Sequence, residues 1–151
     1  MAEESPPKAE EDLTDRLSTL PDSVLCHIMS FLPTRTSVAT MSLVSPRYLH
    51  LWKDLQVFDF NCHHSTSFRK VALFVNSVLT LRKSRDIRRF HLTLTFDDPL
   101  PRDALQLRNA ETWILAAIGP HLQELYLYIR ESCINIPRSL FINCANLVSL
   151  R

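Results

Sequence analysis

The sequence predicts an α+β protein in which three short helices precede a short series of βα repeats. Between residues 20 and 55, apolar residues recur at helical spacing, and prolines stand where helices should start or end. After residue 54, a pattern of alternating apolar residues returns four times, as expected of short strands. The stretches between these strands carry helical stripes, so strand and helix alternate along the second part of the chain.

The bulk composition is that of a folded protein without a polyelectrolyte or membrane partner. Of the 151 residues, 46% are hydrophobic and 22% are charged, and the net charge is +1. No apolar run approaches the ~20 residues that a membrane span needs. The basic stretch from Arg82 to Arg89 is interpreted as a solvated loop at the end of a helix. We therefore expect neither nucleic acid nor a membrane as a partner.

The sequence contains a single glycine, Gly119, where average usage would give about ten. Phosphate-binding loops, dinucleotide fingerprints and nucleophile elbows all need glycine where the backbone approaches a ligand or adopts positive φ. These enzyme classes are excluded, and we expect no catalytic residue and no cofactor. A small hydrolase that uses Cys62 with His63 or His64 is the alternative from another class, and the missing glycine-built oxyanion loop counts against it.

Cysteine usage predicts reduced thiols and no metal site. The four cysteines, Cys26, Cys62, Cys133 and Cys144, form no C-x-x-C pair. Adjacent residues on an extended chain point in alternating directions, so the run from Cys62 to His64 does not make a metal cluster by itself. The acidic, proline-containing start of the chain lacks the features of a secretory signal. We expect a protein of the nucleus, the cytoplasm or both.

Proline, serine and threonine set the limits of the three helices. Pro21 suits a first helical position, and Pro33 disfavours helical geometry at the residue before it. Ser45 followed by Pro46 is a cap and restart signal. The helices are predicted over residues 21 to about 31, from 34 or 36 to about 44, and from 46 to about 55.

The first helix carries apolar residues on more than one side. Together the helices span roughly forty residues, a size at which a core without a disulfide or metal is usually insufficient. Fully burying a Leu, Ile or Phe is worth about 1.5–3 kcal/mol, so leaving such residues in water is costly. One side of this helix is therefore expected to pack on its sister helices. The other side is expected to be buried against the rest of the chain or against a separate protein.

Residues 15 to about 60 carry a phased set of motifs that resembles a known module. The motifs are Leu20-Pro21, the run from Ile28 to Phe31-Leu32-Pro33, Leu43, Ser45 and Trp52. This stretch resembles an F-box, the adaptor-binding module of SCF-type ubiquitin ligases, and is most similar to plant F-box proteins. The family commonly has Leu-Ser-Lys-Arg-Trp where this chain has Val44-Ser45-Pro46-Arg47-Tyr48. This departure is expected to weaken adaptor affinity without abolishing it.

The resemblance implies a Skp-type adaptor as the partner, linked through it to a cullin scaffold and a RING subunit. The sequence does not separate the residues that contact the adaptor from those that form the internal core. The expected adaptor contacts are Leu20, Pro21, Leu25, Ile28, Phe31, Leu32, Leu43 and Trp52.

The second part of the chain fits the leucine-rich template L-x-x-L-x-L at residues 55, 87, 122 and 147. The template starts lie about 32, 35 and 25 residues apart, against a usual repeat of ~20–29 residues. The segment from Ile134 to Leu150 also resembles the leucine-rich part of plant F-box/LRR proteins of the FBD type. We expect a disordered acidic tail over 1–12, an F-box over 13–54 and a partial leucine-rich-repeat domain over 55–151. Because the chain stops inside its fourth template, the solenoid is expected to be short, incomplete and truncated.

Strand alternation separates core residues from a candidate recognition face. In each predicted strand every second residue is apolar, and these residues should form the core of the solenoid. The residues between them lie on the opposite face, which is left for binding. The candidates for contact with a protein substrate are His91, Thr93, Tyr126 and Tyr128. The predicted function is that of a non-enzymatic substrate-recognition subunit of an SCF-type ubiquitin ligase. The alternative is a decoy that binds the adaptor and no substrate.

Overall fold

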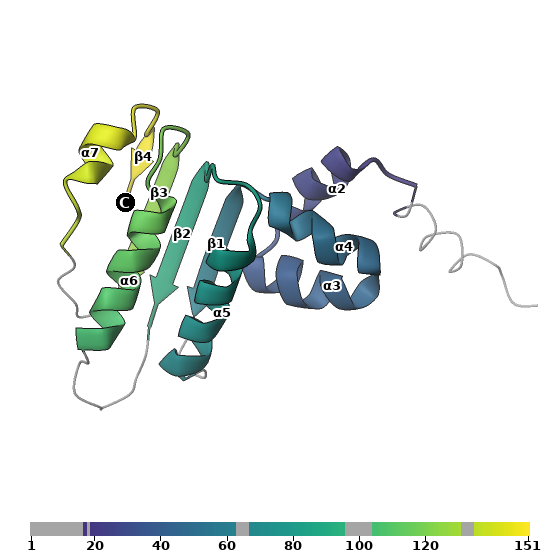
Figure 1. Cartoon of the computed structure of the whole chain (residues 1–151), viewed down its shortest axis with the longest axis horizontal. Coiled ribbons are helices and arrows are strands. Elements are labelled where there is room, and N and C mark those ends of the chain that lie inside the picture. The colour runs from purple at the N-terminus through teal and green to yellow at the C-terminus, as the bar shows by residue number, and fades with distance from the viewer. Residues whose placement is uncertain (1–16, 18, 63–66, 96–103, 131–134) are drawn as a thin grey trace, which may run out of the picture.

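The computed structural model describes residues 17, 19–62, 67–95, 104–130 and 135–151. A lobe of short helices lies beside a sheet that is covered by longer helices (Figure 1). The predicted α+β order, three helical segments followed by βα units, is confirmed. The tail predicted over residues 1–12 lies outside the described residues.

The first predicted helix is present with altered limits, and the second keeps its predicted limits. Helix α2 (Asp22–Met29) follows Pro21, whose extended backbone makes it the N-cap rather than the first helical residue. The helix ends before Phe31, whose N–H makes only a turn-type bond of 3.1 Å to the carbonyl of Ile28. The second helix begins with a π-helical turn, η1 (Thr36–Thr40), and continues as α3 (Met41–Val44).

The third helical segment begins as predicted. Helix α4 (Pro46–Leu51) has proline at its first turn, and the Ser45 hydroxyl accepts a hydrogen bond of 3.3 Å from the backbone N–H of Arg47. A 3₁₀ turn, η2 (Trp52–Asp54), completes the segment. We call residues 21–54, which contain α2, η1, α3, α4 and η2, the helical lobe.

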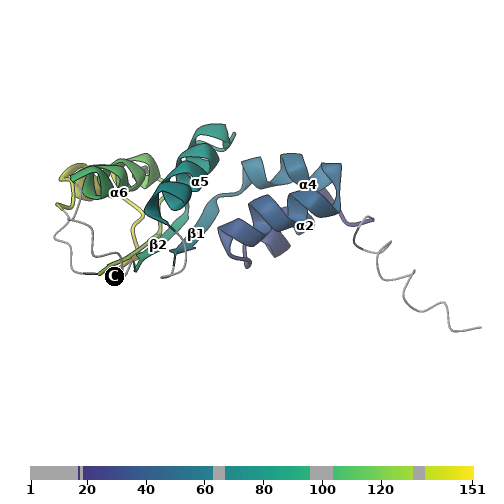
Figure 2. The same cartoon turned by 90° about the horizontal axis from the view of Figure 1, so that it is seen from below.

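The rest of the described chain is a parallel sheet with its connecting helices. Parallel neighbours need crossover connections, and helices supply them here. The strands lie in the order β1 (Val57–Cys62), β2 (Arg89–Leu94), β3 (Glu124–Ile129) and β4 (Ser149–Leu150). The helices are α5 (Phe68–Leu81), α6 (Ala104–Ala117) and α7 (Ser139–Asn143). Figure 2 shows α5 and α6 on the same side of the sheet.

The core lies between the sheet and these helices. The ring of Phe60 on β1 lies 5.7 Å from Phe90 on β2 and 6.2 Å from Phe74 on α5, measured between ring centroids. Helix α6 is tied to α5 by the indole N–H of Trp113, which donates a 2.7 Å hydrogen bond to Oδ1 of Asn76. The strand residues buried in this core are Phe58, Phe60, Phe90, Leu92, Leu94 and Leu125.

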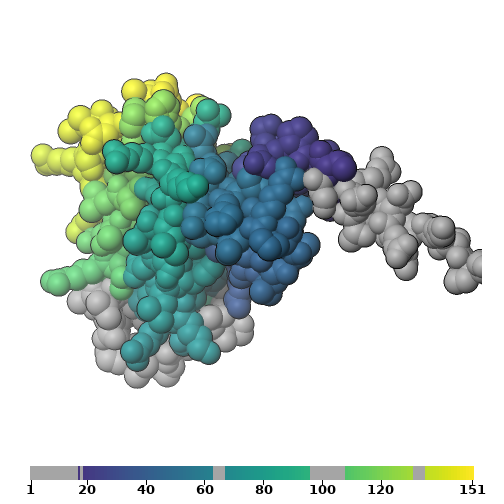
Figure 3. Space-filling model, turned by 45° about the vertical axis from the view of Figure 1, so that its right-hand side comes forward, coloured from purple at the N-terminus to yellow at the C-terminus, as the bar shows by residue number. Residues whose placement is uncertain are grey.

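The helical lobe lies against the free edge of β1. The side chain of Thr34 reaches this edge, and its Oγ1 accepts a hydrogen bond from the backbone N–H of Asp59. On the face seen in Figure 3, the lobe (blue to purple) directly contacts the first βα unit (teal). Since an uncovered strand edge presents unpaired backbone groups, the lobe closes one end of the sheet.

Candidate functional site

The helical lobe exposes large apolar side chains on its surface. Phe31, in the turn after α2, is 71% exposed, and Leu43 on α3 is 88% exposed. Seven large apolar residues are exposed among the described residues up to Asp54. They are Leu17, Val24, Ile28, Phe31, Leu43, Val44 and Leu49. Clusters of this kind on a small domain are typical of protein-binding surfaces.

The structure divides the expected adaptor contacts into three groups. Leu25 and Trp52 are buried in the core, with 2% and 4% of their surface exposed. Leu20 and Leu32 are half-buried. The exposed group consists of Pro21, Ile28, Phe31 and Leu43. Only this last group is exposed enough to contact a partner directly, and the buried pair supports it from the core.

Helix α2 explains this division. Leu25 and Met29 stand one turn apart, so they lie on the same side of the helix and are both buried. Val24 and Ile28 stand one position before each of them and are turned toward solvent. The helix is therefore apolar on two adjoining sides, one packed on its sister helices and one open.

Arg47 fixes the start of α2 against α4. Its guanidinium pairs with the carboxylate of Asp22 and donates a 2.7 Å hydrogen bond from Nη2 to the carbonyl of Leu20. The adjacent Tyr48, which stands where the family commonly has Trp, is only 5% exposed. Within the departure from the family pattern, Tyr48 thus lies in the core of the lobe, whereas Val44 is 67% exposed on its surface.

The sequence prediction did not include four of the exposed apolar residues, Leu17, Val24, Val44 and Leu49. An apolar residue off the buried stripe of a short helix is the signal that identifies such positions.

The second candidate surface is the face of the sheet opposite α5 and α6. Here Glu124 on β3 joins two residues of β2: its Oε2 lies 2.8 Å from Nε of Arg89, and its Oε1 lies 3.1 Å from Nε2 of His91. The ring of His91 lies 5.6 Å from that of Tyr126. These side chains form one connected polar and aromatic cluster across two strands.

The strand register places the four predicted recognition residues together. His91 pairs with Tyr126, and Thr93 pairs with Tyr128, so the four occupy adjacent positions on neighbouring strands. Tyr128 is 49% exposed. Asp59, which pairs with His91, extends the same row and was not selected from the sequence. The period-two alternation that predicted the others identifies it equally well.

The Cys62 thiol does not have the properties of a nucleophile. Burial raises its pKa to about 11, the positive charge of Arg35 opposes this shift, and the negative charge of Asp59 adds to it. A thiol with this pKa is protonated at neutral pH, whereas nucleophilic cysteines act as thiolates. His63 and His64 lie outside the described residues.

Within the described ranges, no group of three or more His, Cys, Asp and Glu side chains is placed to hold a metal ion. Of the helices formed by those residues, none has both the length and the apolar character to cross a bilayer.

The helical lobe matches a known family. Residues 17–60 match the family model described as the F-box domain. This segment of the chain is an F-box domain. F-box proteins are non-catalytic subunits of SCF complexes.

Plant F-box proteins resemble the chain well beyond the F-box itself. An FBD-associated F-box protein of Arabidopsis thaliana is 36% identical over 141 residues, covering 90% of this chain and 31% of the relative. An F-box/LRR-repeat protein of the same plant is 32% identical over 117 residues, covering 78% and 23%. A second FBD-associated F-box protein is 32% identical over 142 residues, covering 91% and 33%.

The similarity therefore extends through the repeats of this F-box protein. The chain spans between 23% and 33% of the length of these three relatives. No solved structure matches it.

Proposed function

We propose that this F-box protein is a substrate-recognition subunit of an SCF-type ubiquitin ligase. In this proposal the F-box binds a Skp-type adaptor, which connects it to a cullin scaffold and a RING subunit. The sheet face around His91 and Tyr126 binds a protein target. The observation that carries the proposal is the exposure of Phe31 and Leu43 on a lobe that matches the F-box domain.

Burial energy is the physical reason for a partner. Transferring a Phe or Leu side chain from water to an apolar environment is worth about 1.5–3 kcal/mol. Phe31, Leu43 and Val44 are each more than two-thirds exposed, so little of this free energy is gained within the chain. An adaptor with a complementary apolar groove would gain it on binding.

The proposed contribution to ubiquitin transfer is proximity. A target held on the repeats is tethered near the charged conjugating enzyme, which raises the effective concentration of its lysines. No catalytic residue of this chain takes part. A subunit of this kind would work in the nucleus, the cytoplasm or both.

The polar face of the sheet supports the second half of the proposal. Its tyrosines combine apolar rings with hydroxyl groups, and aromatic residues of this type are enriched where proteins bind one another. Arg89 and Glu124 add one charge of each sign beside them. A target with mixed polar and apolar side chains fits this surface better than a nucleic acid does.

Co-expression with a Skp-type adaptor tests the proposal. The double variant Phe31→Ser, Leu43→Ser should lose co-purification with the adaptor, while Tyr126→Ala, Tyr128→Ala should retain it. Phe31, Leu43 and Tyr128 are exposed and Tyr126 is half-buried, so circular dichroism should show a folded chain in each case.

Equal retention of the adaptor by both variants would contradict the assignment of the F-box surface. An adaptor complex that captures no target from cell extract and supports no ubiquitin transfer would favour the decoy function instead.

A further inference from the structure

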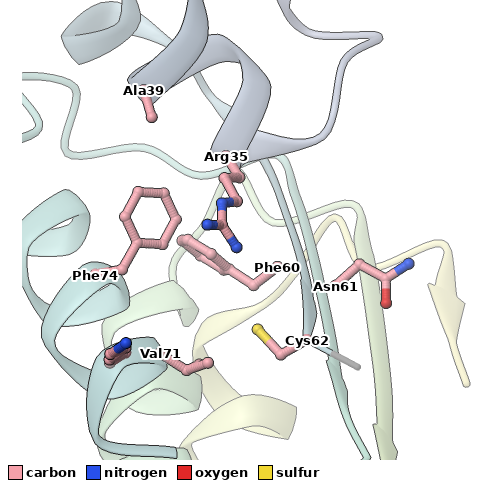
Figure 4. A pocket seen from close by; sticks show the side chains of 8 residues that line it. Arg35, Ala39, Phe60, Asn61, Cys62, Val71 and Phe74 are labelled. Atoms are coloured by element: carbon pink, nitrogen blue, oxygen red, sulfur yellow. The ribbon is translucent and has the colours of Figure 1, made fainter. Parts of the chain in front are cut away.

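A cavity of about 240 Å³ lies where the F-box meets the first βα unit. Its walls come from η1, from β1 and from α5, so it exists only when these three elements are assembled (Figure 4). Phe60 and Val71 form a buried floor, with 2% and 5% of their surface exposed. The lining residues are Arg35, Ala39, Phe60, Asn61, Cys62, Lys70, Val71 and Phe74.

The lining combines apolar side chains with two positive charges. Arg35 and Lys70 line the cavity, and none of the described lining residues is Asp or Glu. In Figure 4 the guanidinium of Arg35 reaches down from the F-box toward Phe60 and Cys62, while the amide of Asn61 points away. Within the described residues, neither Arg35 nor Lys70 forms a salt bridge. Both cations are thus available to an anion from outside the chain.

The π-helical turn η1 supplies the upper wall. Residues four apart on a helix lie on the same side, and Arg35 and Ala39 both line the cavity. Helices rarely contain a π turn, and such turns occur frequently at functional sites. Ala39 contributes only a methyl group, so the space below it stays open. The turn therefore brings a cation and an opening to the same place.

We propose that this cavity binds a small organic acid with a compact apolar body. The carboxylate pairs with Arg35 and Lys70, since guanidinium–carboxylate hydrogen bonds are charge-assisted and directional. The apolar body lies against Phe60, Phe74 and Val71. Pockets that bind small molecules are usually apolar with a few convergent polar groups, as here. The site is separate from Phe31 and Leu43, so it does not depend on adaptor binding.

Calorimetry on the full chain with two matched probes tests the proposal. The probes are 4-phenylbutyrate and its neutral amide, 4-phenylbutyramide. The acid should bind on the order of tenfold more tightly, because a hydrogen bond to a charged group is worth about 1.5–3 kcal/mol. Arg35→Gln should lower the affinity for the acid to that for the amide. Arg69→Gln makes the same charge change on an exposed residue outside the cavity and should leave it unchanged.

Two further measurements keep the test independent of any single variant. Ala39→Phe fills the cavity and should abolish binding of both probes, while Thr40→Phe beside it should not. The sulfur of Cys62 points into the cavity in Figure 4, so the bound acid should slow its alkylation by iodoacetamide. Equal affinity for acid and amide would overturn the proposal. So would equal weakening by Arg35→Gln and Arg69→Gln, or the absence of binding at millimolar concentrations.

Discussion

The backbone N–H of Asp59 donates a 2.7 Å hydrogen bond to Oγ1 of Thr34. Asp59 lies on the first strand of the sheet, and Thr34 lies in the F-box, where it is only 2% exposed. The bond therefore satisfies a donor on the open edge of β1 with a side chain from the adjoining lobe. It makes the F-box a structural cap of the repeats as well as a candidate binding domain.

Replacing Thr34 with Val should destabilise the chain by about 1–3 kcal/mol, because it leaves the N–H of Asp59 without its acceptor in a partly buried place. Urea unfolding followed by tryptophan fluorescence measures the change. Thr40→Val is the matched control, since Thr40 is exposed and its side chain forms no hydrogen bond with another described residue. Equal stability of the two variants would show that the contact between the F-box and β1 does not depend on this hydrogen bond.

Asn76→Ala should lower the free energy of unfolding by about 1–2 kcal/mol. The change removes the acceptor of the Trp113 indole N–H, and Trp113 is 1% exposed, so water does not readily replace the lost partner. Ser77→Ala, on the same helix, should be close to neutral because the Ser77 hydroxyl bonds only to the carbonyl of Leu73 at an exposed position. Thermal unfolding compares the two variants. If Ser77→Ala lowered the free energy of unfolding as much, the effect would come from changes within α5 and not from the bond to Trp113.

Stability should fall between about pH 9 and pH 11 because of Cys62. Burial raises the pKa of its thiol from 9.0 to about 11, so the folded chain keeps this proton at pH values where the unfolded chain releases it. The contribution is fully present below pH 9 and is lost as the pH rises toward 11, with a slope of at most about 1.4 kcal/mol per pH unit.

Comparison with Cys62→Ala isolates this contribution. Urea unfolding from pH 7 to pH 10.5 should show a steeper decline for the unchanged chain than for the variant. The difference at pH 7 serves as the baseline, since the thiol is then protonated in both states. Parallel declines would mean that Cys62 is accessible to water and ionises as it does in the unfolded chain.

Glu124→Gln should change stability by less than about 1 kcal/mol, although it removes the pairs with Arg89 and His91. All three side chains are at least a quarter exposed, and exposed ion pairs contribute little. Glu111→Gln carries the same charge change on α6 and serves as the control in urea unfolding. If Glu124→Gln lowered the free energy of unfolding by more than about 2 kcal/mol, the cluster would have a structural role in holding β2 and β3 together rather than a role in binding.

The strands and their faces could be predicted because the alternation of apolar and polar residues is visible in the sequence itself. Phe90 and Leu92 face the helices, and His91 and Thr93 face away, as the pattern indicated. The helix limits were less accurate. The end of α2 depends on a turn after Met29 that no proline or glycine marks, and the π-helical geometry of η1 has no sequence signal that we recognise.

Neither the exposed surface of the F-box nor the cavity beside Arg35 could be identified fully from the sequence. Leu25 and Ile28 are equally apolar, and only the packing of α2 on its sister helices separates the buried one from the exposed one. The cavity beside Arg35 could not be predicted, because Arg35, Phe60 and Phe74 come from elements that meet only in the folded chain. Their spacing in the sequence has no pattern.

Titration calorimetry of the chain with a purified Skp-type adaptor, repeated at several temperatures, tests the central claim most directly. We expect a saturable one-to-one complex with a negative heat-capacity change, the mark of apolar surface buried on binding. The Phe31→Ser, Leu43→Ser variant should give no binding heat. A folded, monodisperse chain that shows no binding at each temperature, or binding that this variant leaves intact, would contradict the claim.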